Sequence, residues 1–353
     1  MTRSHRKLPS WDSDRTMLDN PADTYADAGG DALYVSTGHL PSSEQVQQWV
    51  DEAHHRYASV SDGRNADIYP ALEHVPSELF GVCAVGTSGS VYAAGDTDHP
   101  FTIMSAAKPF VFAVVCQALG PDETRRLLGV NATGMPFNSL TAVERSTDGR
   151  TNPMVNAGAI ATTSLVPGGH VEEKWQFLID GLSRFAGRPL LLDEEVYASA
   201  SSTNHRNRGI ANLLESYGRV YCDPSSATDL YTRQSCVAVT ATDLATMGAT
   251  LADGGVNPKT KERVVDASIC HYTLAVMTTA GMYENSGDWL YDVGAPGKSG
   301  IGGGIVAVSP GKGGIGTFAP PLDAAGNSVR GQLAARFLSR RLGLSLFVSA
   351  PEA

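Results

Sequence analysis

Strand-like runs lie towards both ends of this chain, and helical stretches fill its middle. Residues 80–96, FGVCAVGTSGSVYAAGD, contain two β-rich runs separated by turn residues, which predicts a hairpin. Residues 294–323 return to short strand-like runs separated by glycine-rich turns. We therefore expect one sheet built from both ends of the chain, with a helical insert over about residues 120–280. This is an α+β arrangement.

Several segments have the patterns of helices. The segment 100–119, PFTIMSAAKPFVFAVVCQAL, is apolar on most faces after Ser105, which predicts a buried helix. Proline lacks an N–H and fits only in the first turn of a helix, so Pro109 places the helix start at or just before Ser105. Further helices are predicted at 42–60 behind a serine cap, at 171–186, 209–218 and 241–255, and at 330–347 as a closing helix.

Length and charge limit the domain organisation and the partners. The chain has 353 residues and a net charge of -10, which argues against nucleic acid or an anionic membrane as the main partner. No apolar run is long enough for a transmembrane helix. Residues 1–35 are polar and lack the apolar region of a secretory signal, so we expect a flexible tail. Residues 36–340 are predicted to form one domain, followed by a C-terminal end at 341–353.

The cysteine and histidine patterns indicate reduced thiols and no metal site. Five cysteines without close pairs are typical of a cytoplasmic protein with reduced thiols. The nine histidines show no HExxH or similar spacing, so we expect no metal.

Ser105 and Lys108 form an S-x-x-K pair within the predicted buried helix. Two other S-x-x-K matches, Ser4–Lys7 and Ser309–Lys312, have no helical context. Residues three apart share one face of a helix. The positive end of the helix and the apolar surroundings would lower the pKa of Lys108, so that it could take a proton from the Ser105 hydroxyl. The Ser105 N–H could donate to an oxyanion. An ordinary helix start, with a serine cap and a solvated lysine, explains the same S-x-x-K pattern.

The stretch KSGIGGGI at 298–305 is a second candidate. Its Lys-Ser-Gly triplet before a β-run is similar to the K-T-G element of penicillin-recognising enzymes, which pair it with S-x-x-K. The N–H of Ile301 could then be a second oxyanion donor. A phosphate-binding loop is disfavoured, because neither a G-K-[ST] ending nor a following helix is present. A plain glycine-rich bend remains the main alternative.

Three polar stretches could supply ligand-binding groups. NPMVNAGAI (152–160) contains Asn156, and TNHRNRGIANLL (203–214) places Asn207 in a polar cluster at a helix start. Amide groups both donate and accept hydrogen bonds, which suits an amide or amino-acid ligand. GMYENSGDWLYDVG (281–294) holds Tyr283 before a predicted turn and strand. Taken singly, each stretch is equally consistent with a structural role.

Together, seven motifs in this order resemble the serine-dependent glutaminases, a family related to the β-lactamases. The resemblance runs from about residue 40 to 320 and is carried by FTIMSAAKPF, GMPFNSL, NPMVNAGAI, HRNRGIANLL, TDLYTRQSC, LADGGVNP and GMYENSGDWLYDVGAPGKSGIGGG. It implies a serine β-lactamase-like fold, with a mixed or antiparallel sheet sandwiched by helices beside a helical part. It also implies hydrolysis of L-glutamine to L-glutamate and ammonia, no cofactor or metal, and a homodimer or homotetramer.

The resemblance also implies roles for individual residues. Ser105 would be the acylating nucleophile, Lys108 would accept its proton, and Tyr283 would relay a proton to the leaving ammonia. The residues that would bind the substrate are Ser105, Asn156, Asn207, Tyr231, Tyr283 and Ile301, the last through its backbone N–H in place of the family's usual valine.

One departure concerns substrate binding. The family has a Ser-Glu pair where this chain has Ser199-Ala200, and that glutamate suits the α-ammonium group of glutamine. Losing one partner of a buried charged contact costs roughly 2–5 kcal/mol. Two lesser departures are Pro109 and the order QSC at 234–236.

Three hypotheses therefore stay open: a working glutaminase, a related amidohydrolase whose substrate lacks a free α-ammonium, and a weakened amino-acid-binding homologue. A penicillin-binding protein is disfavoured, because the export signal and the S-x-N motif are absent.

Overall fold

The computed structural model describes residues 25–26, 32–33 and 40–348. The predicted N-terminal tail lies almost wholly outside the described residues, as do residues 349–353 of the predicted C-terminal end. Two short strands, β1 (Tyr25–Ala26) and β2 (Ala32–Leu33), pair antiparallel.

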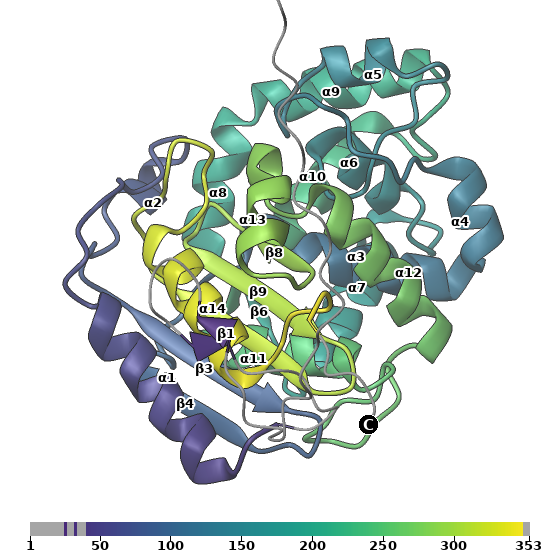
Figure 1. Ribbon diagram of the computed structural model, residues 1–353. Coiled ribbons are helices and arrows are strands. Elements are labelled where there is room, and N and C mark those ends of the chain that lie inside the picture. The colour runs from purple at the N-terminus through teal and green to yellow at the C-terminus, as the bar shows by residue number, and fades with distance from the viewer. Residues whose placement is uncertain (1–24, 27–31, 34–39, 349–353) are drawn as a thin grey trace, which may run out of the picture.

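Both ends of the chain contribute to one five-stranded antiparallel sheet, as predicted (Figure 1). The strand order is β4-β3-β10-β9-β8, so that β8 lies at an edge. The predicted hairpin is confirmed as β3 (Gly81–Gly86) and β4 (Val91–Gly95). The C-terminal strands are β8 (Gly297–Ser299), β9 (Gly304–Ser309) and β10 (Gly313–Phe318).

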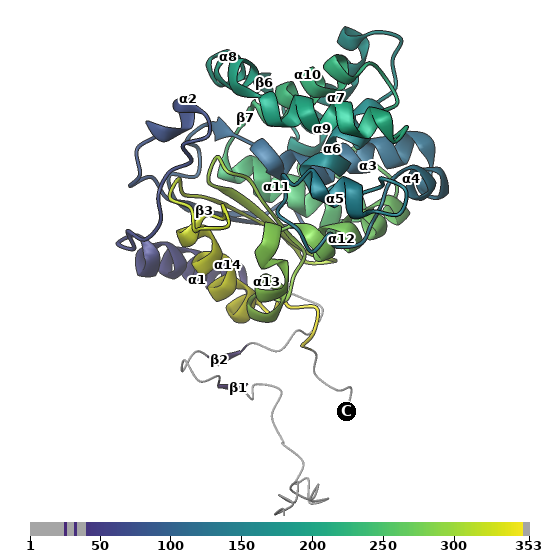
Figure 2. The ribbon, with the colours of Figure 1, turned by 90° about the horizontal axis from the view of Figure 1, so that it is seen from above.

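Helices cover both faces of this sheet (Figures 1 and 2). Side chains alternate along a strand, so Val82 and Ala84 of β3 face α1 (Ser43–Tyr57) and α14 (Val329–Leu342) in one apolar cluster. Cys83 and Val85 face α11 (Ala241–Ala252). Helix α11 lies very close to β10, because a Cβ added at Gly316 would come within 2.1 Å of the Ala241 carbonyl oxygen.

A larger helical part lies beside the sheet and contains most of the predicted insert (Figure 2). At its centre is α3 (Lys108–Leu119), which packs against α6, α7 and α12 in the main apolar core. The helices of this part are α4 (Pro121–Leu127), α5 (Thr141–Arg145), α6 (Asn156–Ser164), α7 (Val171–Ala186), α8 (Glu194–Thr203), α9 (His205–Ser216), α10 (Pro224–Ser235) and α12 (Ala267–Ala280).

Short elements link the two parts. Strands β5 (Phe101–Thr102), β7 (Val237–Val239) and β6 (Leu191–Leu192) form a small antiparallel sheet in that order. Helix α2 (Pro70–Glu73) follows α1, and α13 (Ser286–Asp292) follows the 3₁₀ turn η2 (Tyr283–Asn285).

Three predicted boundaries differ from the structure. The segment 100–119 begins with β5 and a 3₁₀ turn, η1 (Met104–Ala107), and its α-helix starts only at Lys108. The closing helix ends at Leu342 rather than at 347, because Gly343 adopts the left-handed conformation with φ +61°. Tyr283 is followed by helix α13 before strand β8, so the prediction of a turn and a strand missed a helix.

No single helix among the described residues is long and apolar enough to cross a membrane. One pair bent by 116°, Met104–Leu119 with Pro121–Leu127, meets the requirement by length and composition only.

Candidate active site

Ser105 lies in the 3₁₀ turn η1, directly before the buried helix α3. The preceding residue, Met104, has a φ of 48°, an uncommon value for a side chain of this size. The turn after β8 lies against η1, since a Cβ at Gly300 would come within 2.6 Å of the Ile103 carbonyl oxygen and 3.3 Å of the Ser105 nitrogen.

This close approach brings together the two predicted oxyanion donors. Ile301 follows Gly300 in the turn between β8 and β9, beside the sheet edge. Within the described part of the chain, neither the Ser105 N–H nor the Ile301 N–H donates to a backbone carbonyl. Both N–H groups are therefore available to a ligand.

Lys108 begins helix α3 and is almost completely buried. Its Nζ donates to the side-chain oxygen of Asn156 over 2.7 Å, and no carboxylate of the described residues forms an ion pair with it. Burial lowers the pKa of Lys108 from 10.5 to about 7. At neutral pH a large fraction of these side chains is therefore a neutral amine, as the sequence predicted from the apolar surroundings.

A chain of amide groups surrounds this lysine. The Asn156 side-chain oxygen also accepts from the Tyr231 hydroxyl at 3.0 Å, and the Asn156 amide nitrogen donates to Asn207 at 3.0 Å. Asn207 donates to Asn204, which donates to Thr232. The predicted residues Asn156, Asn207 and Tyr231 come from α6, α9 and α10 and are brought together with Lys108.

Tyr283 approaches from the other side, in the 3₁₀ turn η2, with a φ of 55°. Its hydroxyl donates to the Ser299 carbonyl at 3.0 Å. Burial raises the pKa of both Tyr283 and Tyr231 well above the usual value, and the nearby Ser105 hydroxyl offsets only part of this rise. Both phenols stay protonated near neutral pH, and both lie near the Ser105 hydroxyl.

A second buried lysine, Lys298, supports Tyr283. Its Nζ donates to the carbonyl oxygens of Gly281 at 2.8 Å and Ser299 at 2.7 Å, and it lies 4.2 Å from the Tyr283 ring centroid. Burial lowers the pKa of Lys298 well below its usual value, and the charge of Lys108 lowers it further. The contact with the ring packs the Lys298 side chain against Tyr283.

A cavity opens beside Ser105. Its lining includes the predicted residues Ser105, Asn156, Ala200, Asn207, Tyr231 and Ile301. Lys108 and Tyr283 do not line it. Tyr283 instead lines a neighbouring cavity, and Phe137, whose ring centroid lies 4.4 Å from that of Tyr283, borders both.

Sequence reasoning missed two residues of this site and gave a third, Lys298, no role of its own. Tyr69, just before α2, lines the cavity, and burial raises its pKa to about 12. Asn204 extends the amide chain, and Lys298 holds the segment that carries Tyr283. The K-S-G motif pointed to the place of Lys298, but nothing in the sequence indicated Tyr69.

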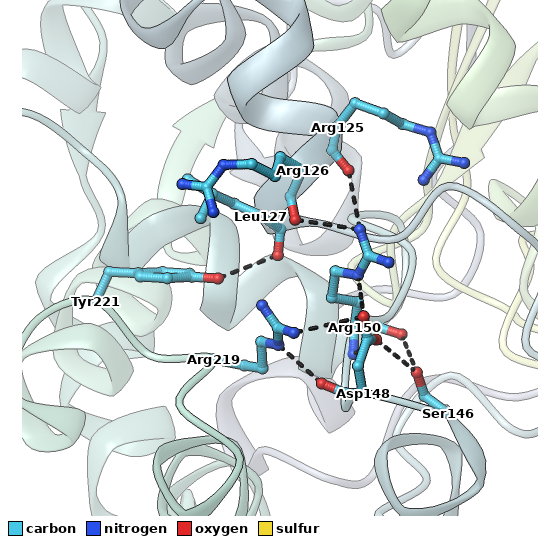
Figure 3. A network of polar contacts seen from close by, with 8 residues as sticks. All are labelled: Arg125, Arg126, Leu127, Ser146, Asp148, Arg150, Arg219 and Tyr221. Carbon is cyan, nitrogen blue, oxygen red and sulfur yellow. Dashed lines mark hydrogen bonds and ion pairs between the residues drawn. The ribbon is translucent and has the colours of Figure 1, made fainter.

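A polar network holds the chain segment that leads into Asn156 (Figure 3). Asp148 accepts from Arg150 at 2.6 Å and lies 3.4 Å from Arg219, while Arg150 donates to the carbonyls of Arg125 and Arg126. Partial burial raises the pKa of Asp148, but the bonds from Arg150 and the charges of Arg150 and Arg219 outweigh it and hold the pKa below its usual value. These contacts join α4, the loop after α5 and the link from α9 to α10.

The other S-x-x-K matches are not part of this site. Ser4–Lys7 lies outside the described residues. Ser309 donates to the Leu344 carbonyl and Lys312 to the Gly343 carbonyl, at the far end of β9. Within the described ranges no group of three or more His, Cys, Asp or Glu side chains could hold a metal ion.

Comparisons with known proteins identify the family of this chain. The glutaminase family model matches residues 63–347. Glutaminase 2 of Yersinia pestis is 68% identical over 318 residues, which cover 90% of this chain and 94% of the relative.

Two solved structures are also similar. A probable glutaminase, ybaS, has a TM-score of 0.85 and 46% identity, with 87% of this chain and 99% of that one covered. Mglu in its glutamate form has a TM-score of 0.82 and 36% identity, with 86% and 70% covered. The resemblance and the fold class predicted from the sequence are confirmed.

Proposed function

Because this chain belongs to the glutaminase family and is therefore a hydrolase, we propose that it hydrolyses L-glutamine to L-glutamate and ammonia through an acyl-enzyme on Ser105. The single observation that carries the mechanism is the buried, unpaired Lys108, whose pKa is about 7, one helical turn from the serine. A serine hydroxyl is a weak nucleophile until a base takes its proton, and a neutral lysine is such a base.

In the acylation step, the Ser105 oxygen adds to the carbon of the substrate's side-chain amide while its proton passes to Lys108. The negative charge that forms on the amide oxygen is stabilised by the N–H groups of Ser105 and Ile301. The carbon–nitrogen bond then breaks, and the nitrogen leaves as ammonia after it receives a proton.

Tyr283 delivers that proton. Its phenol stays protonated near neutral pH and lies near the Ser105 hydroxyl. The phenol then regains a proton from Lys108, which holds the proton that it took from Ser105. Lys298 acts as a positioning residue, since its two bonds fix the backbone around Tyr283.

Deacylation reverses these roles. A water molecule adds to the ester carbon while Lys108 takes its proton, and the same two N–H groups stabilise the second oxyanion. The bond from carbon to the Ser105 oxygen then breaks, the proton returns to Ser105, and glutamate leaves. No other reactant is needed.

The substrate is held by the amide chain. Asn156 and Asn207 each present polar groups to the cavity beside Ser105, and Tyr231 forms its wall over α10. Amide side chains match both the donor and the acceptor of a carboxamide. Arg206, at the cavity mouth, supplies positive charge for a substrate carboxylate.

The predictions about the extent of the catalytic domain, the location in the cell and the oligomeric state stay proposals. We propose that residues 36–340 act as one catalytic unit. The five cysteines are free thiols, which supports a cytoplasmic location. We keep the homodimer or homotetramer as a prediction for size measurements in solution.

The test is Ser105→Ala, assayed by ammonia release from L-glutamine and by intact mass. We expect a loss of at least about a thousandfold in kcat with an unchanged fold. Ser309→Ala is the matched control, because it removes the serine of the second described S-x-x-K pair and should keep activity. Wild-type rates from Ser105→Ala would remove this serine from the nucleophile's role.

A further inference from the structure

The cavity beside Ser105 carries no negative charge. Among its lining residues, Arg206 has the only permanently charged side chain, and no Asp or Glu lines it. Three further ionisable groups line it, Tyr69, Tyr231 and Cys236, and burial raises the pKa of each above an ordinary value that is already higher than 7, so all three are neutral near pH 7.

The wall around Ala200 is apolar. Ala200 lies on α8, is 1% exposed, and clusters with Met104, Val196 and Cys236. Ile301 packs against the same cluster. This wall offers contact area to an uncharged substituent, but it offers an ammonium group no partner.

Two carboxylates on elements that contribute to this wall serve other contacts. Asp193 caps α8 by accepting from the Val196 N–H, and Asp229 accepts from the Tyr197 hydroxyl and pairs with Arg233. Neither carboxylate lines the cavity. The charged and titratable groups that line the cavity are therefore Arg206, the phenols of Tyr69 and Tyr231 and the thiol of Cys236, while Lys108 is buried and bonded to the lining residue Asn156.

Free α-amino acids carry an ammonium group that loses its hydration when it is buried. In a cavity with one guanidinium and no carboxylate, that loss is not offset by an opposite charge. A carboxylate on the ligand, in contrast, finds Arg206. The cavity therefore favours the carboxylate of L-glutamine and disfavours its α-ammonium group.

We propose that this site favours ω-carboxamides that keep a carboxylate but whose α-nitrogen is uncharged or absent, such as N-acyl-L-glutamines and 4-carbamoylbutanoate, over L-glutamine itself. This inference rests on the proposed function, because the same Ser105 attacks the same side-chain amide. The C–N bond of the amide breaks, ammonia leaves and water supplies the carboxylate oxygen, as for glutamine.

The experiment measures kcat/KM for L-glutamine, N-acetyl-L-glutamine and 4-carbamoylbutanoate with the wild-type enzyme. We expect the two substrates that lack an α-ammonium group to exceed L-glutamine in kcat/KM by roughly tenfold or more. Ala200→Glu should reverse this order, whereas Ala200→Gln, equal in size but uncharged, should not. Thermal melts establish that each variant is folded, and the wild-type ratio decides the question if Ala200→Glu does not fold.

A wild-type preference for L-glutamine overturns this inference and leaves the proposed function standing. If Ala200→Glu and Ala200→Gln are both folded and rank the three substrates in the same order, the inference is also overturned and the proposed function still stands. Release of ammonia from none of the three substrates contradicts the proposed function itself. Activity on all three that survives in Ser105→Ala contradicts the shared mechanism.

Discussion

Two polar networks of this protein treat charge in opposite ways. Around Asp148, partly exposed arginines and a carboxylate neutralise each other, and the carboxyl group keeps its charge. Around Ser105, two lysines are buried against carbonyl and amide oxygens without a carboxylate. Ion pairing keeps the Asp148 carboxylate charged and holds the chain segments together. Burial without a carboxylate partner lowers the pKa of Lys108, so that its amine can act as a base.

The energetic consequences differ as well. Exposed or partly exposed pairs contribute about 0–1 kcal/mol each, so the Asp148 network stabilises modestly. A buried lysine with a lowered pKa destabilises the fold at neutral pH, because folding must expel a proton that the unfolded chain would keep. The active site thus reduces stability in return for reactivity.

The largest expected effect comes from removing the base. Lys108→Met should lower kcat by at least about a thousandfold, because Ser105 then lacks a proton acceptor. The same variant should raise Tm by roughly 2–5 °C at pH 7–8. The measurements are ammonia release and calorimetry, with the exposed Lys259→Met as a control that changes neither.

The sign of this stability effect has its own pH signature. The folded pKa of Lys108 is about 7 and the usual value is 10.5. The destabilisation is therefore largest below pH 7 and disappears as pH rises to 10.5. A Tm gain in Lys108→Met that stays constant from pH 7 to pH 10 contradicts a buried neutral lysine.

A smaller effect follows from giving the catalytic lysine the kind of partner that Asp148 provides elsewhere. Asn156→Asp places a carboxylate 2.7 Å from the Lys108 Nζ, which should raise the pKa of Lys108 by at least about one unit. We expect kcat/KM at pH 7 to fall by roughly a hundredfold and to recover partly at high pH. The measurement is the pH profile of kcat/KM.

The control is Asn156→Ala, which also loses substrate contacts but adds no charge. Its activity should fall at every pH, without a shift of the apparent pKa. Equal profiles for the two variants would mean that the charge of Lys108 does not limit the rate.

The smallest effect is expected in the paired network. Asp148→Asn removes the partner of Arg150 and Arg219. Because the Asp148 side chain is about a third exposed, Tm should fall by roughly 1–3 °C and kcat/KM by no more than about twofold. Glu123→Gln, which breaks the exposed pair with Arg126, should change Tm even less. A large activity loss in Asp148→Asn would show that the network sets the position of Asn156 directly.

The sequence predicted those parts of the site that are local in the chain. Ser105 and Lys108 are three residues apart, so their closeness could be read from spacing alone, whereas the helix start inferred from Pro109, at or just before Ser105, was wrong because α3 begins at Lys108. Alternating and apolar runs likewise predicted the hairpin and the buried helix α3. The 3₁₀ turn η1 was missed, since local spacing does not distinguish it from a first α-helical turn.

The missed features depend on contacts between distant residues. Lys298 acts through Gly281, 17 positions earlier, and Arg219 meets the backbone of Asp148 across 71 positions. Tyr69 enters the cavity because α2 packs near α8, which no pattern around Tyr69 reveals. The lack of a carboxylate in the cavity lining depends on residues from several elements. In the sequence, only Ala200 indicated it.

The most direct test of the central claim is to follow acyl-enzyme formation against pH, by rapid quench and mass spectrometry of the peptide that contains Ser105. We predict an adduct on Ser105 equal to the substrate minus ammonia, formed at a rate that rises with an apparent pKa of about 7. An adduct on another residue, or a rate that stays flat between pH 6 and about 9, contradicts a serine activated by a neutral lysine.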